Sequence, residues 1–89
     1  MGKKDDARIF NVRISEASKI IWEGKAVSVS SENAEGKFDI LAMHSNFITL
    51  VRKAPITVVD AEGNETVYKF DLSVIFVTGN IVKVFADIQ

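Results

Sequence analysis

The side chains that could carry nucleophilic or acid–base chemistry are sparse in this sequence of 89 residues. The chain has a single histidine, His44, and no cysteine. Ser45 follows that histidine, but successive side chains on a strand diverge, so the two do not form a nucleophile and its base. The sequence also lacks G-x-S-x-G, the P-loop and the G-x-G-x-x-G phosphate loop. We therefore predict a protein that is not an enzyme.

A metal or cofactor site would have to be built around the same histidine. The nearby carboxylates are Glu35 and Asp39, and no second histidine stands at ligand spacing from His44. A lone histidine beside a loop is more often a structural group that hydrogen-bonds backbone carbonyls, which is the role we expect here. Trp22, the single tryptophan, is expected to pack in the core or in a hairpin rather than to form a binding hot spot. We expect no cofactor and no metal.

The charge balance argues against a polyanionic partner. The 11 basic and 12 acidic residues give a formal net charge of −1. The basic pairs Lys3-Lys4 and Arg52-Lys53 are too short to form a phosphate-binding stripe, so we expect no nucleic acid. No apolar run approaches the roughly 18 residues of a membrane-spanning helix, and the polar N-terminus lacks the apolar region of a signal peptide. The chain is expected to be soluble and cytoplasmic.

The elements that must position these side chains follow from a hydrophobic period of two residues. Apolar and polar residues alternate in four runs, which are Arg8–Ile14, Lys25–Ser31, Gly36–Leu41 and Glu65–Leu72. Such alternation is typical of a strand with one buried face. No window shows a sustained period of 3.6 residues, so we expect no long helix.

Turn residues separate the alternating runs. Asn33–Gly36 and Asp60–Asn64 are rich in residues that favour turns, and Gly79-Asn80 predicts a tight two-residue hairpin because both residues tolerate positive φ. The only proline, Pro55, opens the run Ile56–Asp60, where a missing N–H does least harm to a sheet. The close, regular spacing of short strands is typical of a sandwich or barrel.

The sequence therefore predicts an all-β fold, a small β-sandwich of about 8–10 short, mostly antiparallel strands. The segment Phe47–Val51 fits either a helical turn or a short strand, and the pattern does not decide between them. No linker or repeat divides the chain. We expect residues 1–7 to form a flexible N-terminal tail and residues 8–89 to form a single domain.

One region breaks the alternation, because Val74–Val77 and Ile81–Ala86 carry apolar residues on both faces. Either these are central strands whose second face is covered by loops or by their own curled sheet, or another chain covers that face. We place the interface with a partner on one of the two sets and keep the other as its alternative, because the sequence does not show which set faces inward. The first set is Ile75, Val77, Val82 and Val84, and the alternate set is Val74, Phe76, Ile81 and Phe85.

Three segments resemble the amino-terminal β-sandwich domain of the epsilon subunit of F-type ATP synthases. Trp22–Val29 resembles the family's apolar-Glu-Gly segment followed by an alternating strand. Glu35–Leu50 is similar to the family signature, which has a Gly turn, an apolar residue, an Ile two residues on, a His four further and then an apolar stretch. Gly79–Asp87 is similar to the closing hairpin. The resemblance covers Ile9 to Asp87, and the order of the motifs carries more weight than any one of them.

The sequence departs from the family pattern at three places and in length. Asp39 stands where family members usually have Gly, Ala42-Met43 stands where they have Pro-Gly, and Ser73-Val74 replaces a Gly pair. Many members continue into a helical hairpin, whereas this sequence stops at Gln89. It is either a natural short form or a truncated piece.

The resemblance implies a non-catalytic rotor subunit of an ATP synthase. Such a domain lies at the foot of the central stalk, binds the gamma subunit, contacts the ring of membrane c subunits and couples proton transport to ATP synthesis. The two-faced strands would meet gamma. The chain would be peripheral to the membrane, at the cytoplasmic inner face of the plasma membrane, through the complex only. The loop that would face the c-ring comprises Lys37, Ala42, Met43, His44 and Ser45.

Two other functions stay open at this point. The chain could be a free-standing β-sandwich that binds a different protein, or a small β-barrel enzyme or metal-binding protein centred on His44. Binding of the gamma subunit encoded in the same genome separates the first alternative from the rotor subunit. Binding of Zn²⁺ that is lost on His44→Ala would favour the second. In isolation, the second apolar face is expected to cause weak self-association.

Overall fold

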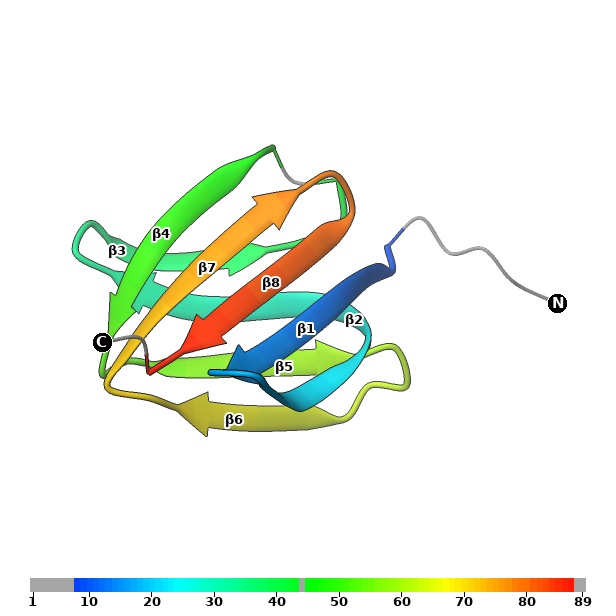
Figure 1. The fold of residues 1–89 in the computed structure, drawn as a ribbon. Helices are drawn as coiled ribbons and strands as arrows, with labels where there is room; N and C mark the ends of the chain where they lie inside the picture. The colour runs from blue at the N-terminus through cyan, green and yellow to red at the C-terminus, as the bar shows by residue number, and fades with distance from the viewer. Residues whose placement is uncertain (1–7, 44, 88–89) are drawn as a thin grey trace, which may run out of the picture.

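The computed structural model describes residues 8–43 and 45–87, and all regular elements of these residues are strands (Figure 1). This confirms the predicted all-β fold, although the tail predicted for residues 1–7 and the role predicted for His44 lie outside the described residues. The strands are β1 (Phe10–Glu16), β2 (Lys19–Asn33), β3 (Gly36–Ile40), β4 (Phe47–Arg52), β5 (Pro55–Asp60), β6 (Glu65–Lys69), β7 (Leu72–Thr78) and β8 (Ile81–Ala86).

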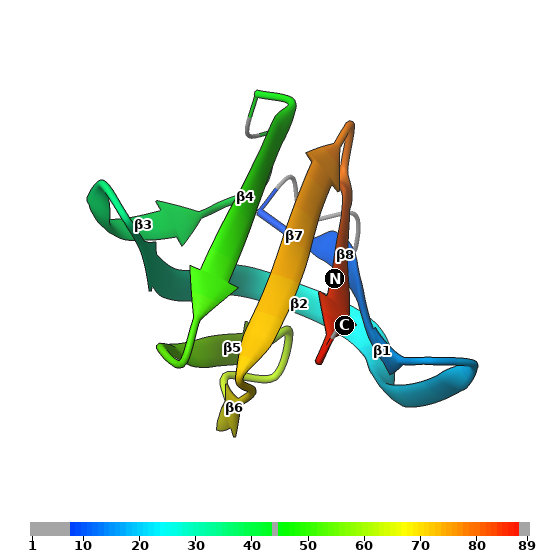
Figure 2. The same ribbon diagram turned by 60° about the vertical axis from the view of Figure 1, so that its left-hand side comes forward.

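One continuous sheet folds over itself to make the two layers. Its strand order is β4-β7-β8-β1-β2-β5-β6, and β3 pairs with β2 off this path. The pairs are antiparallel except that β1 runs parallel to β8. β4, β7, β8 and β1 form one layer, while β3, β5, β6 and part of β2 form the other (Figures 1 and 2). The structure is therefore a small, mostly antiparallel sandwich, as predicted.

Strand β2 connects the layers because it is 15 residues long. Its first half pairs with β1, where Lys25 lies opposite Asn11. Its second half pairs with both β3 and β5, where Val29 lies between Ile40 and Val58. The register shifts within both the β1 and the β5 pairings of β2, and such irregularities let a strand bend from one layer into the next.

The structure decides one segment that the sequence left open and corrects one strand that was predicted too long. Phe47–Val51 lies in strand β4, so it is not a helical turn. The run Glu65–Leu72, predicted as one strand, is broken between Lys69 and Leu72, where the chain passes from one layer to the other. At this corner the Asp71 N–H donates to Asp87 Oδ1 at 2.9 Å and the Asp71 carbonyl accepts from the Lys53 N–H at 3.1 Å. The alternation runs through the corner unchanged, which is why it hides the break.

The core lies between the two layers and settles which face of β7 and β8 is buried. Ile75, Val77, Val82 and Val84 are only 0–3% exposed. The assignment of these four residues to a partner interface was therefore wrong, because no partner reaches them in the folded domain. The alternate set lies on the outer surface instead. Alternation alone could not decide this, since both faces of the two strands are apolar.

The predicted turns are found where the sequence placed them. Thr78 pairs with Ile81 across the turn Gly79-Asn80, and Gly79 has a φ of 58°. The β5–β6 turn is held by the Asp60 carboxylate, which accepts hydrogen bonds from the N–H groups of Glu62 and Asn64 at 2.9 Å. The hydrogen bonds that Asp60 accepts, led by that of Asn64, lower the pKa of its carboxyl below the usual 3.8.

Candidate protein interface

An apolar surface covers the outer face of β4, β7 and β8. We call it the outer apolar face, and it comprises Ile48, Leu50, Val74, Phe76, Ile81 and Phe85. Ile48 is 61% exposed and Phe76 is 41% exposed. The strand register brings these residues together, because Ile48 lies opposite Phe76 and Val74 lies between Leu50 and Phe85. Large apolar side chains gathered in this way mark an interaction surface.

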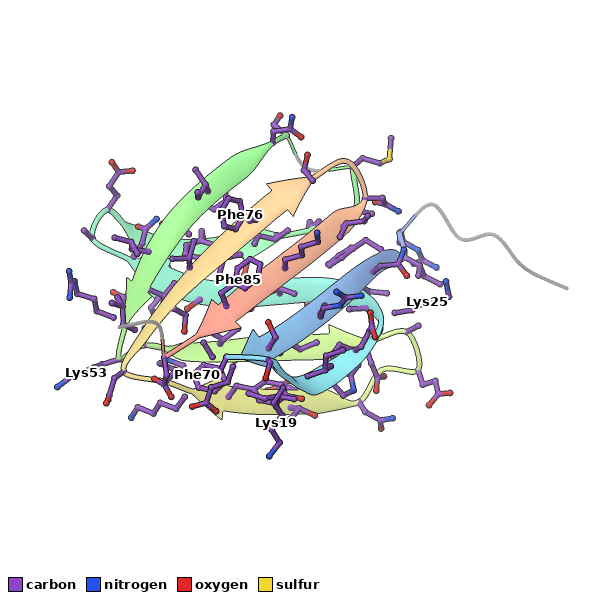
Figure 3. All side chains as sticks on the ribbon, viewed as in Figure 1. Lys19, Lys25, Lys53, Phe70, Phe76 and Phe85 are labelled. Atoms are coloured by element: carbon purple, nitrogen blue, oxygen red, sulfur yellow. The ribbon has the colours of Figure 1, made fainter. Side chains whose placement is uncertain are left out.

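Two phenylalanines form the centre of the outer apolar face. The rings of Phe76 on β7 and Phe85 on β8 meet edge to face, with centroids 5.6 Å apart and planes at 87° (Figure 3). This contact hides part of each ring, yet Phe85 stays 38% exposed. Aromatic side chains with few rotatable bonds are favoured anchors at interfaces because little entropy is lost when they bind.

Polar residues border the outer apolar face on its β8 and β1 side. Lys83 lies opposite Phe76 on one side and Arg13 of β1 on the other. Arg13 forms an ion pair with Glu23 of β2 at 2.9 Å, and both side chains are about half exposed (48% and 50%). An apolar centre with a polar rim is the usual anatomy of a protein–protein interface. Sequence patterning revealed the two apolar faces, but it did not reveal that β4 would extend the surface.

A second exposed surface lies at one end of the sandwich, which we call the tip and define as residues 41–43, 45 and 46 with the turn Gly79-Asn80. Figure 1 shows the β3–β4 connection and the β7–β8 turn at the same end of the molecule. Leu41 and Met43 expose apolar side chains there, at 55% and 78%. Met43 also has a φ of 64°, in the left-handed region that glycine adopts most easily.

Asn80 holds the tip together. Its side-chain amide donates to the Ile9 carbonyl at 2.8 Å, and its side-chain oxygen accepts from the Met43 N–H at 3.4 Å. Its backbone carbonyl accepts from the Asn11 N–H at 3.0 Å. Asn46 adds a contact from the other loop, since its Oδ1 accepts from the Gly79 N–H at 3.3 Å. Sequence analysis treated Asn80 only as a turn residue and missed this role, which depends on contacts distant in the chain.

The structure separates the residues predicted to face the c-ring. Ala42, Met43 and Ser45 lie in the β3–β4 connection, whereas Lys37 lies in β3 beside its turn with β2. At about 3.3 Å per residue, Lys37 stands roughly 10 Å along β3 from Ile40, where the strand ends and the connection begins. The described members of the predicted loop therefore form one group of three and one separate lysine. His44, the fifth predicted residue, lies outside the described residues.

The described residues show little that would support chemistry. Residues 8–43 and 45–87 contain no group of three acidic, histidine or cysteine side chains placed to hold a metal ion. Of the two carboxylates considered for such a site, Asp39 accepts a hydrogen bond from the Ser30 hydroxyl at 2.6 Å, and Glu35 lies in the β2–β3 turn. Burial raises the pKa of Tyr68 above its usual 10.0, away from any role as a base near neutral pH. In this part of the chain we also find no helix with the length and hydropathy to span a membrane.

Comparison with known proteins identifies the family and the fold. Residues 9–88 match the family model described as the ATP synthase, Delta/Epsilon chain, beta-sandwich domain. The ATP synthase epsilon chain of Clostridium novyi (strain NT) is 30% identical over 81 residues, which cover 91% of this chain and 62% of the relative. A chain in the cryo-EM structure of the Euglena gracilis mitochondrial ATP synthase, OSCP/F1/c-ring in rotational state 1, has the same fold with a TM-score of 0.81 and 15% identity, covering 94% of this chain and 53% of that chain.

This protein thus spans less than two thirds of the length of the relatives that it matches. The family match nevertheless covers almost all of the described strands, from the start of β1 to the end of β8. The fold, the order of the sequence motifs and the family model all agree. The chain belongs to the family of ATP synthase delta and epsilon chains, of which it forms the β-sandwich domain.

Proposed function

We propose that the chain is a non-catalytic central-stalk subunit of an F-type ATP synthase, which binds the gamma subunit and contacts the c-ring. In this role it helps to couple proton transport to ATP synthesis without chemistry of its own. The observation that carries the proposal is the outer apolar face, because a large group of exposed apolar side chains on a second face marks an interaction site. Membership of the family supports the choice of these partners.

The gamma subunit is assigned to the outer apolar face. Phe76 and Phe85 stand at its centre and Lys83 and Arg13 at its rim. Anchors of this kind contribute most when they are central and fully desolvated, whereas the rim mainly excludes water. The assignment replaces the buried residues Ile75, Val77, Val82 and Val84 by their exposed neighbours on the same strands.

The c-ring is assigned to the tip. Ala42, Met43 and Ser45 lie there, and Lys37 is left out of this contact because it lies at the other end of β3. Leu41 and Met43 present apolar side chains, and the network around Asn80 fixes the tip to the same layer that carries the outer apolar face. One rigid layer thus serves both contacts, which suits a subunit that transmits torque. Through this complex the chain is peripheral to the cytoplasmic inner face of the plasma membrane.

Binding to the gamma subunit encoded in the same genome tests the proposal. Wild-type chain is expected to form a 1:1 complex measurable by calorimetry, and Phe76→Ser should weaken it about tenfold or more, the scale of a central hot spot. Val67→Ser is the matched control, since Val67 is also exposed (56%) but lies on β6 in the other layer. A wild-type chain that does not bind gamma overturns the proposed function.

A further inference from the structure

Strand β4 ends its layer with an open edge. Among residues 8–43 and 45–87 it pairs only with β7, on one side, and the sheet path ends there. Its register with β7 runs from Phe47 to Arg52 without a bulge. An open edge presents a row of backbone N–H and C=O groups that an added strand can pair with.

The backbone direction along β4 follows from one hydrogen bond just beyond its end and from the register. The Lys53 N–H donates to the Asp71 carbonyl at 3.1 Å, just beyond the paired residues Arg52 and Leu72. Because hydrogen-bonded positions alternate along an antiparallel pair, the odd-numbered residues of β4 direct their N–H and C=O groups to β7. Ile48, Leu50 and Arg52 therefore direct theirs to the open edge.

The edge of β4 lacks the features that protect other edges in this protein. β3 carries Gly36, Lys37 and Asp39, and β6 carries Glu65 and Lys69. β4 has no proline and no glycine, and its only charge is Arg52 at its last position. Proteins normally blunt edge strands with charges, prolines or bulges to prevent pairing with other chains. An edge without them is suited to a regular partner.

A groove runs beside this edge and has an acidic wall. It lies between the β2–β3 turn, which contributes Asn33 and Glu35, and the β4 residues Phe47, Ile48 and Leu50. The Asn33 side-chain amide donates to Thr49 Oγ1 at 2.9 Å and fixes the turn against β4. Glu35 is exposed, so its carboxylate is available to a cation that enters the groove. The groove thus offers apolar contacts on the outer side of the edge and a negative charge on the inner side.

We propose that the partner subunit binds by adding an extended strand to the open edge of β4. This strand alternates apolar side chains, which continue the row of Ile48 and Leu50, with a lysine or arginine, which enters the groove and meets Glu35. The inference rests on the proposed function and specifies its geometry. The layer β4-β7-β8-β1 then continues into the partner, next to the contact made by the outer apolar face.

Binding of the gamma subunit by proline variants tests this geometry. Leu50→Pro removes one edge N–H, and proline is tolerated on an edge strand where that group faces outward. It should weaken gamma binding about tenfold or more relative to Leu50→Ala, which shortens the side chain but keeps the N–H. Val67→Pro is the matched control, because the Asp60 N–H to Asn64 carbonyl bond and the β5–β6 register direct the Val67 N–H to the open edge of β6. It should bind like wild type.

Amide hydrogen exchange by NMR keeps the test independent of variant folding. In the wild-type complex the amides of Ile48, Leu50 and Arg52 should exchange more slowly than in the free chain, by at least about tenfold. The exchange rates of the Glu65 and Val67 amides should not change. Glu35→Lys should weaken binding, and a matched Glu62→Lys in the β5–β6 turn should not. If wild type binds gamma while these edge amides keep their free exchange rates, the added-strand geometry is wrong and the proposed function stands. Failure of wild type to bind gamma overturns both, and protection of the edge amides by a second copy alone would overturn the assignment to gamma.

Discussion

Single residues in this domain are constrained by packing as much as by backbone geometry. Trp22 and Gly24 lie on one face of β2, opposite Ile14 and Val12. Trp22 packs against the core, as predicted, and its indole lies over Gly24. A Cβ atom at Gly24 would come within 2.8 Å of the Trp22 Cζ2 atom. The glycine of the Trp22-Glu23-Gly24 motif therefore makes room for the tryptophan, and it is not needed for a turn.

Replacing this glycine should destabilise the domain through overpacking. We expect Gly24→Ala to lower the free energy of unfolding by about 1–3 kcal/mol, because the added methyl group forces the indole to move. Urea unfolding measures the change. In a Trp22→Leu background the same substitution should cost less, so the two changes should not be additive. Equal costs in both backgrounds would show that the indole is not the cause.

The carboxyl of Asp60 should make stability depend on acidic pH. Its pKa in the folded state lies below 3.8, chiefly because of the backbone hydrogen bond from Asn64. A lowered pKa contributes stability that is present above the unfolded-state value near 3.8 and is lost as pH falls through the folded-state pKa. NMR titration should place the Asp60 pKa below 3.8, and Asp60→Asn should remove this part of the acid dependence while keeping an acceptor for the turn. A measured pKa at or above 3.8 contradicts the assignment.

Each strand sorts its side chains between core and surface. In β8 the burial alternates without exception from Ile81, which is exposed, to Ala86, which is buried. In β7 the same holds for the neighbours Ile75 and Phe76, at 0% and 41% exposure. The larger residue of this pair faces outward, so side-chain size alone would have placed them the wrong way round.

Neighbouring substitutions on β7 should therefore have opposite consequences. Ile75→Ala should lower the free energy of unfolding by about 2–5 kcal/mol, because it leaves a cavity in the core. Phe76→Ala should cost less than Ile75→Ala, because the side chain is 41% exposed and its ring contact with Phe85 is worth only about 0.5–1.5 kcal/mol beyond area burial, but it should weaken gamma binding. Chemical denaturation and calorimetry separate the two effects. If Phe76→Ala destabilised the domain as much as Ile75→Ala, the outer face would not be a free surface.

The sequence predicts strands well where one face is polar and less well elsewhere. The alternation over Arg8–Ile14 and Gly36–Leu41 agrees with β1 and β3, and Gly79-Asn80 is the predicted hairpin turn. The sequence pattern did not show that β2 begins as early as Lys19, because several apolar residues follow one another in the first half of this strand and hide the alternation. It also did not reveal the parallel pairing of β1 with β8 or the contacts of Asn80, since both depend on tertiary proximity that a local pattern does not record.

The whole molecule is one folded sheet, and the layer β4-β7-β8-β1 carries the two proposed contacts. Strand β2 ties the layers, and the hydrogen bond from Asn33 to Thr49 joins the β2–β3 turn to β4 across them. The outer apolar face lies on the layer β4-β7-β8-β1, and the hydrogen bonds of Asn80 and Asn46 join the tip to this layer. A domain of this size has a small margin of stability, and the side chains of the outer apolar face add little to it because they stay largely in water.

The last prediction concerns the domain without its partner. The outer apolar face should cause weak self-association, because apolar surface that gamma would cover is left in water. Interfaces that bury less than roughly 1,200 Å² are typical of weak, transient contacts, so for this small group of side chains we expect dissociation constants in the high micromolar to millimolar range. Sedimentation velocity over a wide concentration range should show faster sedimentation at high concentration.

Phe76→Ser and Phe85→Ser should reduce this self-association, and Val67→Ser should leave it unchanged. Adding gamma should replace the self-associated species by a 1:1 complex, since both use the same face. A chain that stays strictly monomeric, and whose Phe76 and Phe85 variants bind gamma normally, would show that this face is not the interface.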